Sequence, residues 1–110
     1  MNPQVFITQR AKRDIREIVT WIKARSLKGA KSWLAVLEKT LGQLPKSAAS
    51  SAAAVESNDF GLDMRQRLFK TRRGNTYRLV FTLHNGIVHI LAVRGAGQDL
   101  LQQNEIEIPE

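Results

Sequence analysis

An asparagine–glycine pair in the last third of the chain is the feature that most strongly restricts its possible folds. Asn85 and Gly86 separate two stretches, residues 76–83 and 87–94, whose side chains follow a period of two rather than a helical period. A period of two is typical of β-strands, and Asn-Gly tolerates the positive φ angles that a type I′ turn requires. The sequence therefore predicts a β-hairpin in this part of the chain.

The two-residue loop sets the register of this hairpin, because pairing can be counted back from the turn. The predicted pairs are His84 with Ile87, Phe81 with Ile90, Arg78 with Val93, and Tyr77 with Arg94. One face is then apolar enough to receive helices, and it holds Tyr77, Leu79, Phe81, Leu83, Val88, Ile90 and Ala92. The reverse face is mixed, and it holds Arg78, Val80, Thr82, His89, Leu91 and Val93. An arginine inside that face must be either solvated or paired.

Two amphipathic helices are predicted before the hairpin. A short apolar strand at residues 5–8 leads into the first helix, and Thr8 is placed to cap it. The first helix turns Asp14 and its charged neighbours to solvent, and its core-facing stripe is Ala11, Ile15, Ile18, Val19 and Ile22. The second helix is expected to end at Pro45, and its stripe is Ala30, Trp33, Leu34, Leu37, Leu41 and Leu44. Trp21 and Trp33 have core-facing spacing, so we expect both to pack rather than to stack on bases.

A serine- and alanine-rich stretch at residues 47–54 follows the second helix. This composition suits either a loop or an alanine-driven extra turn of helix, and we favour the loop. A further strand is predicted after residues 60–61. Its one face holds Arg65, Arg67 and Phe69, and its other face holds Leu68 and Lys70.

These elements predict an α+β fold in one domain spanning residues 1–110, with an N-terminal strand and a two-helix hairpin packed on one face of a small antiparallel β-sheet. The absence of cysteine excludes disulfides and thiolate chemistry, and two isolated histidines do not make a metal site, so we expect no metal and no cofactor. Residues 1–7 lack the features of a signal peptide, and no apolar run approaches membrane-spanning length. We therefore expect a cytoplasmic protein with no membrane partner.

The net charge of the chain lies in the predicted sheet. Residues 64–98 contain no acidic side chain and seven basic ones, which equals the formal charge of +7 of the whole chain. Such a charge field suits phosphate or an acidic protein segment. The basic residues are Arg65, Arg67, Lys70, Arg72, Arg73, Arg78 and Arg94.

The order of elements, the size and the charge together resemble the RelE/ParE superfamily of bacterial toxins over nearly the whole chain. In the first helix the similar residues are Thr8, Ala11, Asp14, Ile15, Ile18, Trp21 and Ile22. In the strands they are residues 65–68, 77–81 and 88–94, which look like the branch called plasmid-stabilisation proteins. The resemblance implies the toxin of a type II toxin–antitoxin system. Such a toxin inhibits growth until an acidic antitoxin neutralises it in a hetero-oligomer.

For the RNA-cleaving members, the resemblance implies a metal-independent endoribonuclease that cuts messenger RNA in the ribosome. The 2′-hydroxyl attacks the adjacent phosphate, and fixed cations stabilise the developing anion. Arg78 matches the family's arginine after the strand tyrosine and would hold the phosphate bidentately. Arg65 and Arg67 match the basic pair of the preceding strand, and His89 is a candidate general base. The residues assigned to further nucleic-acid contacts are Lys70, Arg72, Arg73, Tyr77 and Arg94.

Some of these residues also suit purely structural roles. For Arg72 and Arg73 we favour a solvated turn, and for His89 an ordinary strand position. For Arg78 we favour a functional role, because burying a lone cation would be costly. After Arg94 the chain continues into residues 95–99, which lack the basic, tyrosine or histidine groups that the nucleases carry there.

Three functions remain open at this point. The first is an endoribonuclease toxin, the second is a ParE-type poison of DNA gyrase that acts by protein contact, and the third is a non-toxic basic nucleic-acid-binding module. The composition of residues 95–99 favours the gyrase poison over the nuclease, whereas the density of arginines favours the nuclease.

Overall fold

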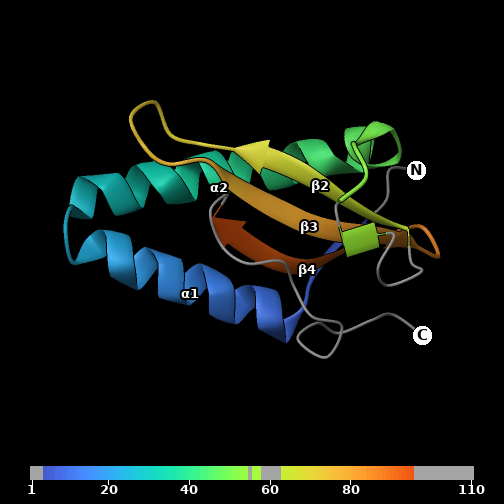
Figure 1. Cartoon of the computed structure of the whole chain (residues 1–110), viewed down its shortest axis with the longest axis horizontal. Coiled ribbons are helices and arrows are strands. Elements are labelled where there is room, and N and C mark those ends of the chain that lie inside the picture. The colour runs from blue at the N-terminus through green and yellow to red at the C-terminus, as the bar shows by residue number, and fades with distance from the viewer. Residues whose placement is uncertain (1–3, 55, 58–62, 96–110) are drawn as a thin grey trace.

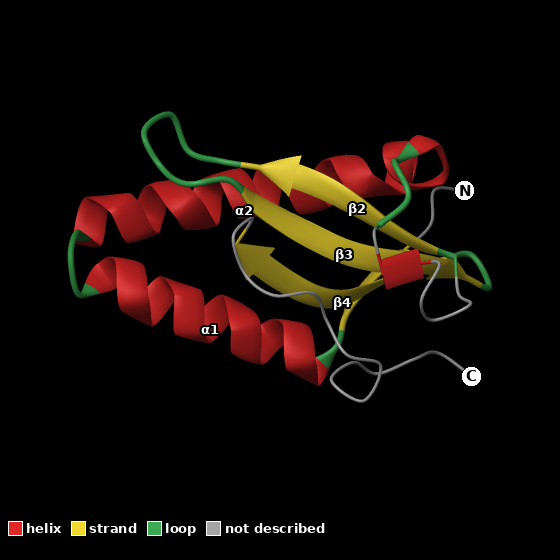
Figure 2. Cartoon of the chain, viewed as in Figure 1, coloured by secondary structure: helices red, strands yellow, loops and turns green. Residues whose placement is uncertain are grey.

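The computed structural model describes residues 4–54, 56–57 and 63–95 (Figure 1). In chain order the elements are strand β1 (Gln4–Ile7), helices α1 (Gln9–Lys23) and α2 (Leu27–Ser47), the 3-10 helix η1 (Ala48–Ser50), and strands β2 (Met64–Phe69), β3 (Tyr77–His84) and β4 (Ile87–Gly95). The two long helices form a hairpin that lies against the sheet (Figure 2). The predicted α+β fold is therefore confirmed.

The sheet differs from the expected one at a single edge. Its strand order is β1-β4-β3-β2. β2, β3 and β4 pair antiparallel, as predicted, but β1 lies parallel to β4, so the sheet is mixed. Parallel pairing needs a long connection, and the helical hairpin together with β2 and β3 supplies it.

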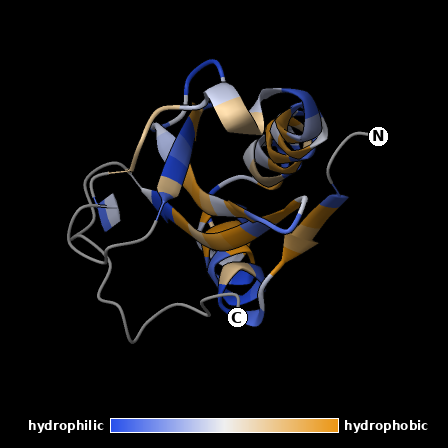
Figure 3. Cartoon of the chain, turned by 90° about the vertical axis from the view of Figure 1, so that its right-hand side faces the viewer, coloured by the Kyte–Doolittle hydropathy of each residue, from blue (hydrophilic) through white to orange (hydrophobic). Residues whose placement is uncertain are grey.

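A continuous apolar core fills the space between the sheet and the two helices. Trp33, Leu37 and Leu44 of α2 meet Leu79 and Phe81 of β3 in this cluster, and α1 adds Ala11 with several partly buried residues. In Figure 3 hydrophobic residues, coloured orange, make up much of the strands and part of each helix. A smaller cluster lies on the reverse face of the sheet and contains Ala54, Met64, Val80, Leu91 and Ala92.

The Asn85-Gly86 turn forms as predicted, with φ angles of 51° and 74° at the two residues. His84 pairs with Ile87 and Phe81 with Ile90, which confirms the register near the turn. Beyond Ile90 the predicted register is wrong, because the pairing shifts by one residue at Leu91.

This β-bulge places Arg78 opposite Arg94 and Tyr77 opposite Gly95, rather than opposite Val93 and Arg94. The extra residue reverses the faces of everything that follows it. Val93 joins the helix-side core and Ala92 joins the reverse face, the opposite of the prediction. Arg94 consequently lies on the reverse face of the sheet, beside Arg78.

The start of α1 binds the backbone of β4 at this bulge. The Thr8 side chain caps α1 by accepting from the N–H of Ala11, as predicted, and its hydroxyl donates to the carbonyl of Ile90 at 2.8 Å. Asp14 was expected in solvent and is instead buried, since its carboxylate accepts from the N–H of Val93 at 3.0 Å and pairs with Arg10 at 2.9 Å. β1 ends opposite Ile90, so α1 satisfies the edge of β4 where β1 stops.

Replacing Asp14 with alanine should lower the free energy of unfolding by about 2 kcal/mol, because the buried N–H of Val93 then loses its acceptor. Urea denaturation followed by circular dichroism measures the loss. Asp14→Asn is the matched control, since an amide oxygen can still accept that hydrogen bond. Equal losses in the two variants would mean that the charge, rather than the acceptor, is what matters.

Three further expectations for the helices are corrected. α2 continues past Pro45 to Ser47. A proline at this position removes one backbone hydrogen bond, and only two helical residues follow it, so the distortion affects little of the helix. Trp33 is buried as predicted, but Trp21 is 52 % exposed and the guanidinium of Arg25 stacks on its ring at 3.7 Å. Leu34 is also exposed.

Residues 47–54, which were expected to form a loop, contain a short helical turn followed by a segment that pairs with β2. Ser47 belongs to α2, and η1 adds a short helical turn. Ala52 and Ala54 then form backbone hydrogen bonds with Gln66 and Met64 of β2. This pairing covers the outer edge of β2 and leads the chain directly to Glu56.

Candidate functional site

The strongest cluster of charge around the predicted site is a buried ion pair on the reverse face of the sheet. Arg78 of β3 donates to both carboxylate oxygens of Glu56, at 2.9 Å and 2.5 Å. Its Nη1 also donates to the side-chain oxygen of Gln66 on β2 at 3.3 Å. Glu56 is fully buried and Arg78 is 8 % exposed. The guanidinium predicted to hold a phosphate thus already holds a carboxylate with the same bidentate geometry.

The bulge and the segment that contains Glu56 together explain this pair. Arg94 lies directly opposite Arg78 on the neighbouring strand, which places two guanidinium groups on one face of the sheet. The carboxylate of Glu56 supplies negative charge beside Arg78, and the pairing of residues 52–54 with β2 leads the chain toward it. Without that carboxylate, Arg78 would be a buried cation whose desolvation is costly.

The other two predicted catalytic arginines lie on the opposite face of the sheet. Arg65 and Arg67 pair with Phe81 and Leu79, whose side chains belong to the helix-side core. Arg65 donates to the carbonyls of Ala48 and Ala49 in η1, beyond the end of α2, and it pairs with Asp63 at 3.0 Å. Arg67 points toward Gln43 of α2 at 3.4 Å. The sheet therefore separates Arg65 and Arg67 from Arg78.

His89 lies on the same face as Arg78 but toward the other end of the strands. Its partner Thr82 is four positions along β3 from Arg78, which corresponds to about 13 Å. Its ring packs 5.7 Å from that of Phe6 and 6.1 Å from that of His84. Burial, with a smaller contribution from His84, lowers the pKa of His89 below its ordinary value of 6.5. A neutral imidazole can act as a base, but no predicted phosphate ligand lies beside it.

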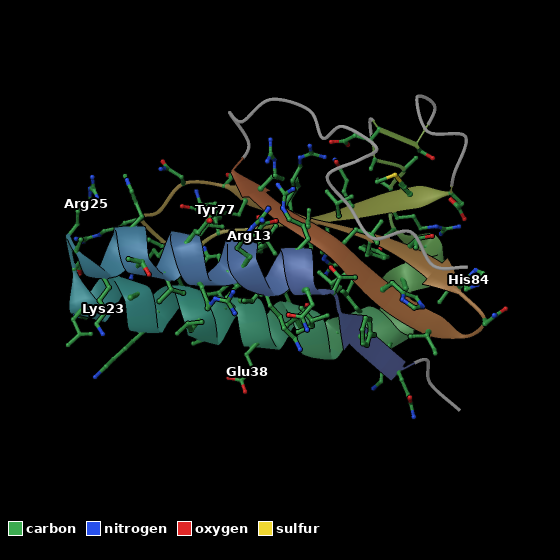
Figure 4. The ribbon with its side chains drawn as sticks, turned by 90° about the horizontal axis from the view of Figure 1, so that it is seen from below. Arg13, Lys23, Arg25, Glu38, Tyr77 and His84 are labelled. Atoms are coloured by element: carbon green, nitrogen blue, oxygen red, sulfur yellow. The ribbon has the colours of Figure 1, made fainter. Side chains whose placement is uncertain are left out.

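The remaining predicted nucleic-acid residues gather around the loop between β2 and β3. Lys70, Arg72 and Arg73 are exposed there. Tyr77 is partly buried and packs against the rings of Trp33 at 5.5 Å and Phe69 at 5.9 Å, which also contact each other at 5.6 Å. Tyr77 and the hairpin residue Arg25 lie toward one end of the molecule, and His84 lies at the other (Figure 4).

A cavity of about 840 Å³ lies between this loop and the tip of the helical hairpin. Residues from α1, from the start of α2 and from residues 71–77 line it. In the turn that lines it, a Cβ at position 74 would meet the hydroxyl of Thr71, so a larger residue there would require that side chain to rotate. This cavity was not predicted, because it forms only where two distant segments meet.

The structure thus divides the predicted site into four places: the buried Arg78 pair, the Arg65 and Arg67 side, the histidine end and the basic loop. Sequence reasoning missed Glu56, which follows an unremarkable alanine stretch, and missed the bulge that moves Arg94. Residues 96–99, which bore on the choice between nuclease and gyrase poison, lie outside the described residues. Among the residues described, no group of three or more side chains could hold a metal ion. No helix in the described ranges is both long enough and apolar enough to span a membrane.

A comparison with known protein families identifies the family of the chain. The sequence model for the family described as "ParE toxin of type II toxin-antitoxin system, parDE" matches residues 5–100 of the chain. That range includes every described element except the first residue of β1. No curated protein matches the chain.

Proposed function

Since the chain belongs to the ParE toxin family of type II toxin–antitoxin systems, we propose that it stops growth by binding DNA gyrase through protein contact. Membership of the family makes the chain a toxin with an antitoxin partner. We further propose that the toxin acts in the cytoplasm and that the antitoxin neutralises it by forming a hetero-oligomer with it. In this proposal residues 1–110 act as one domain, and the toxin has a role in plasmid stabilisation.

The observation that carries this choice of target is the buried pair of Arg78 and Glu56. Metal-independent cleavage of RNA needs cations directed at the reacting phosphate. Arg78, the first candidate for that role, is 8 % exposed and bound through two hydrogen bonds to Glu56, so a phosphate would have to displace a buried carboxylate. Arg65 and Arg67 lie across the sheet, and His89 is about 13 Å away along it. This arrangement supports a toxin that works by contact.

Cleavage of messenger RNA is the second candidate, and one observation favours it. Lys70, Arg72 and Arg73 are exposed together in one loop, as a surface that binds a nucleic-acid backbone would be. The same cations suit a non-toxic nucleic-acid-binding module. Both alternatives rest on charge alone, and the nuclease also lacks an assembled set of catalytic groups among the described residues.

Expression of the wild-type chain without its antitoxin should arrest bacterial growth while messenger RNA stays intact. The purified protein should inhibit supercoiling by gyrase, and added antitoxin should reverse that inhibition. Mapping of transcript ends in arrested cells and a supercoiling assay measure the two effects. Arrest with new, regularly placed transcript ends and unaffected supercoiling would favour the nuclease. Growth without arrest would favour the binding module.

A further inference from the structure

We infer that one end of the molecule, formed by the turn between α1 and α2 and by the loop between β2 and β3, binds the phosphate backbone of duplex DNA. The inference goes beyond the proposed function, because it concerns a ligand that the toxin binds by itself, whether or not gyrase is the target. Gyrase acts on duplex DNA, so such binding gives the toxin a second contact there beside the one with the protein.

Exposed cations gather at this end, which is named the cationic end below. Residues 18–37, which contain the turn between the helices, carry four basic side chains and no acidic one. Arg72 and Arg73 of the loop line the same cavity as Lys28 of α2, so the loop and the tip of the helical hairpin are neighbours. Both lie toward the left of Figure 1. The exposed cations of this end are Lys23, Arg25, Lys28, Lys31, Lys70, Arg72 and Arg73.

Among the described residues, no carboxylate forms an ion pair with a member of the cationic end. The acidic residues nearest in sequence to its helical part are Glu17, six residues before Lys23, and Glu38, seven residues after Lys31. At a rise of about 1.5 Å per residue, each lies about 10 Å away along its helix. The arginines whose ion pairs the structure describes lie elsewhere, and they are Arg10, Arg65 and Arg78. The positive charge of the cationic end is therefore available to a ligand.

The position of Lys28 is unfavourable for the helix that carries it. Lys28 is the second residue of α2, and the first turn of this helix contains no acidic side chain. The N-terminus of a helix carries a partial positive charge, so acidic residues stabilise it and a cation there costs stability. Lys23, in the last turn of α1, has the favourable placement. Helix stability thus accounts for Lys23 but not for Lys28, whereas an anionic ligand accounts for both.

A duplex is favoured over a single strand by the aromatic side chains at this end. The guanidinium of Arg25 covers one face of Trp21 at 3.7 Å. Trp33 is 2 % exposed, and the ring of Tyr77 packs against it at 5.5 Å. Proteins that bind single strands stack bases on free aromatic faces, and these rings offer little. Binding to a duplex needs only cations that reach phosphate oxygens, which this end supplies.

The size of the cationic end suits contact with less than one turn of DNA. The molecule measures 38 × 32 × 22 Å, and this end lies across its longest dimension (Figure 1). A contact of at most 32 Å is shorter than one helical turn of a duplex, which is about 34 Å. Phosphates follow one another at about 3.4 Å along each strand, so this span holds about nine on one strand. The phosphates in reach therefore outnumber the cations.

Fluorescence anisotropy with a labelled duplex of about 20 base pairs and mixed sequence measures the binding, using the purified chain without gyrase. With about five phosphate contacts, the slope of log K against log salt concentration should be about −4.5. The affinity should then fall by roughly 10²–10³ between about 50 and 200 mM salt. A shallow slope, of about −1 or less in magnitude, would contradict the inference.

Reversing charge at the cationic end should weaken this binding more than reversing it elsewhere. Lys28→Glu with Arg72→Glu should lower the affinity at least about tenfold and make the slope shallower by about two. Lys12→Glu with Arg13→Glu is the matched control, because it changes the net charge equally at two exposed positions on α1 that lie about 15 Å or more from Lys23 along the helix. The control should leave the slope unchanged and alter the affinity by less than about threefold.

A second measurement uses only the wild-type chain, so it does not depend on any variant folding. Amide resonances should shift most at residues 23–31 and 70–75 when duplex DNA is added. They should stay in place at residues 84–87, since His84 lies at the opposite end of the molecule (Figure 4).

Equal weakening by both charge-reversal pairs, or shifts centred on residues 84–87, would overturn the inference. Tighter binding of a single strand of equal charge would assign the cationic end to unpaired nucleic acid instead. Poly-glutamate that displaces the labelled duplex more effectively than unlabelled duplex of equal charge would assign it to an acidic protein. Duplex binding together with unaffected supercoiling by gyrase would contradict the proposed target and leave this inference standing.

Discussion

Replacing Glu56 with alanine is expected to lower the free energy of unfolding by about 3–5 kcal/mol. The side chain of Glu56 is fully buried, and its two oxygens accept from Arg78 at 2.9 Å and 2.5 Å. The variant leaves the guanidinium of Arg78 buried at 8 % exposure, opposite Arg94 and without this carboxylate. A loss of this size is a large part of the total stability of about 5–15 kcal/mol that is typical of a domain.

Chemical denaturation followed by circular dichroism measures the loss, and a second ion pair in the same chain provides the control. Asp63 pairs with Arg65 at 3.0 Å but keeps 65 % of its side chain exposed. Asp63→Ala should therefore cost no more than about 1 kcal/mol, because an exposed pair gains little from its Coulomb attraction. If Glu56→Ala cost as little as Asp63→Ala, water would reach Arg78, and the argument that a phosphate cannot reach it would fail.

Replacing both members of the buried pair with apolar residues should return most of the stability and leave toxicity intact. In Glu56→Leu with Arg78→Met, neither charge remains to be left unpaired, and apolar substitutes for a buried pair are often neutral or stabilising. An arginine that held the phosphate in the transition state would behave differently. Its loss should reduce the rate of cleavage by roughly 10²–10³ in the folded variant, by analogy with the removal of one oxyanion donor.

The double variant therefore separates the contribution of Arg78 to folding from a role in chemistry. Unfolding curves establish that the variant is folded, and growth arrest and gyrase supercoiling are then compared with the wild-type chain. Arg78→Met alone is the necessary comparison, because it should be unstable through the unpaired carboxylate of Glu56. A well-folded double variant that no longer arrests growth would restore Arg78 as a functional residue and contradict the proposed target.

The local features of the fold could be predicted from the sequence. The Asn85-Gly86 turn, the capping of α1 by Thr8 and the strand that carries Arg65 and Arg67 on one face all formed as expected. Each of these depends on residues that are close together in the chain. The preferences of a turn, a cap or a period of two act at that range.

The composition of the site depended on contacts between distant segments. A single extra residue at Leu91 moved Arg94 to the face of Arg78, and counting from the turn could not show this. Asp14 has the spacing of a solvent-facing helix residue, yet it is buried because β1 ends and leaves the N–H of Val93 to be satisfied. Trp21 has core-facing spacing and remains half exposed, because it lies near the end of α1, where the helical hairpin extends past the strands (Figure 1).

The α+β class, the two helices, the basic sheet and the resemblance to a toxin family could all be read from the order of residues in the chain. Those properties follow from periodicity, from turn chemistry and from the sum of charges, which do not depend on which residues meet. Three features became visible only in the folded chain: Arg78 pairs with Glu56, Arg65 and Arg67 lie across the sheet from it, and a cavity forms beside Trp33. Pairing, burial and cavities arise from residues tens of positions apart, so only the packing of helices on a bulged sheet brings them together.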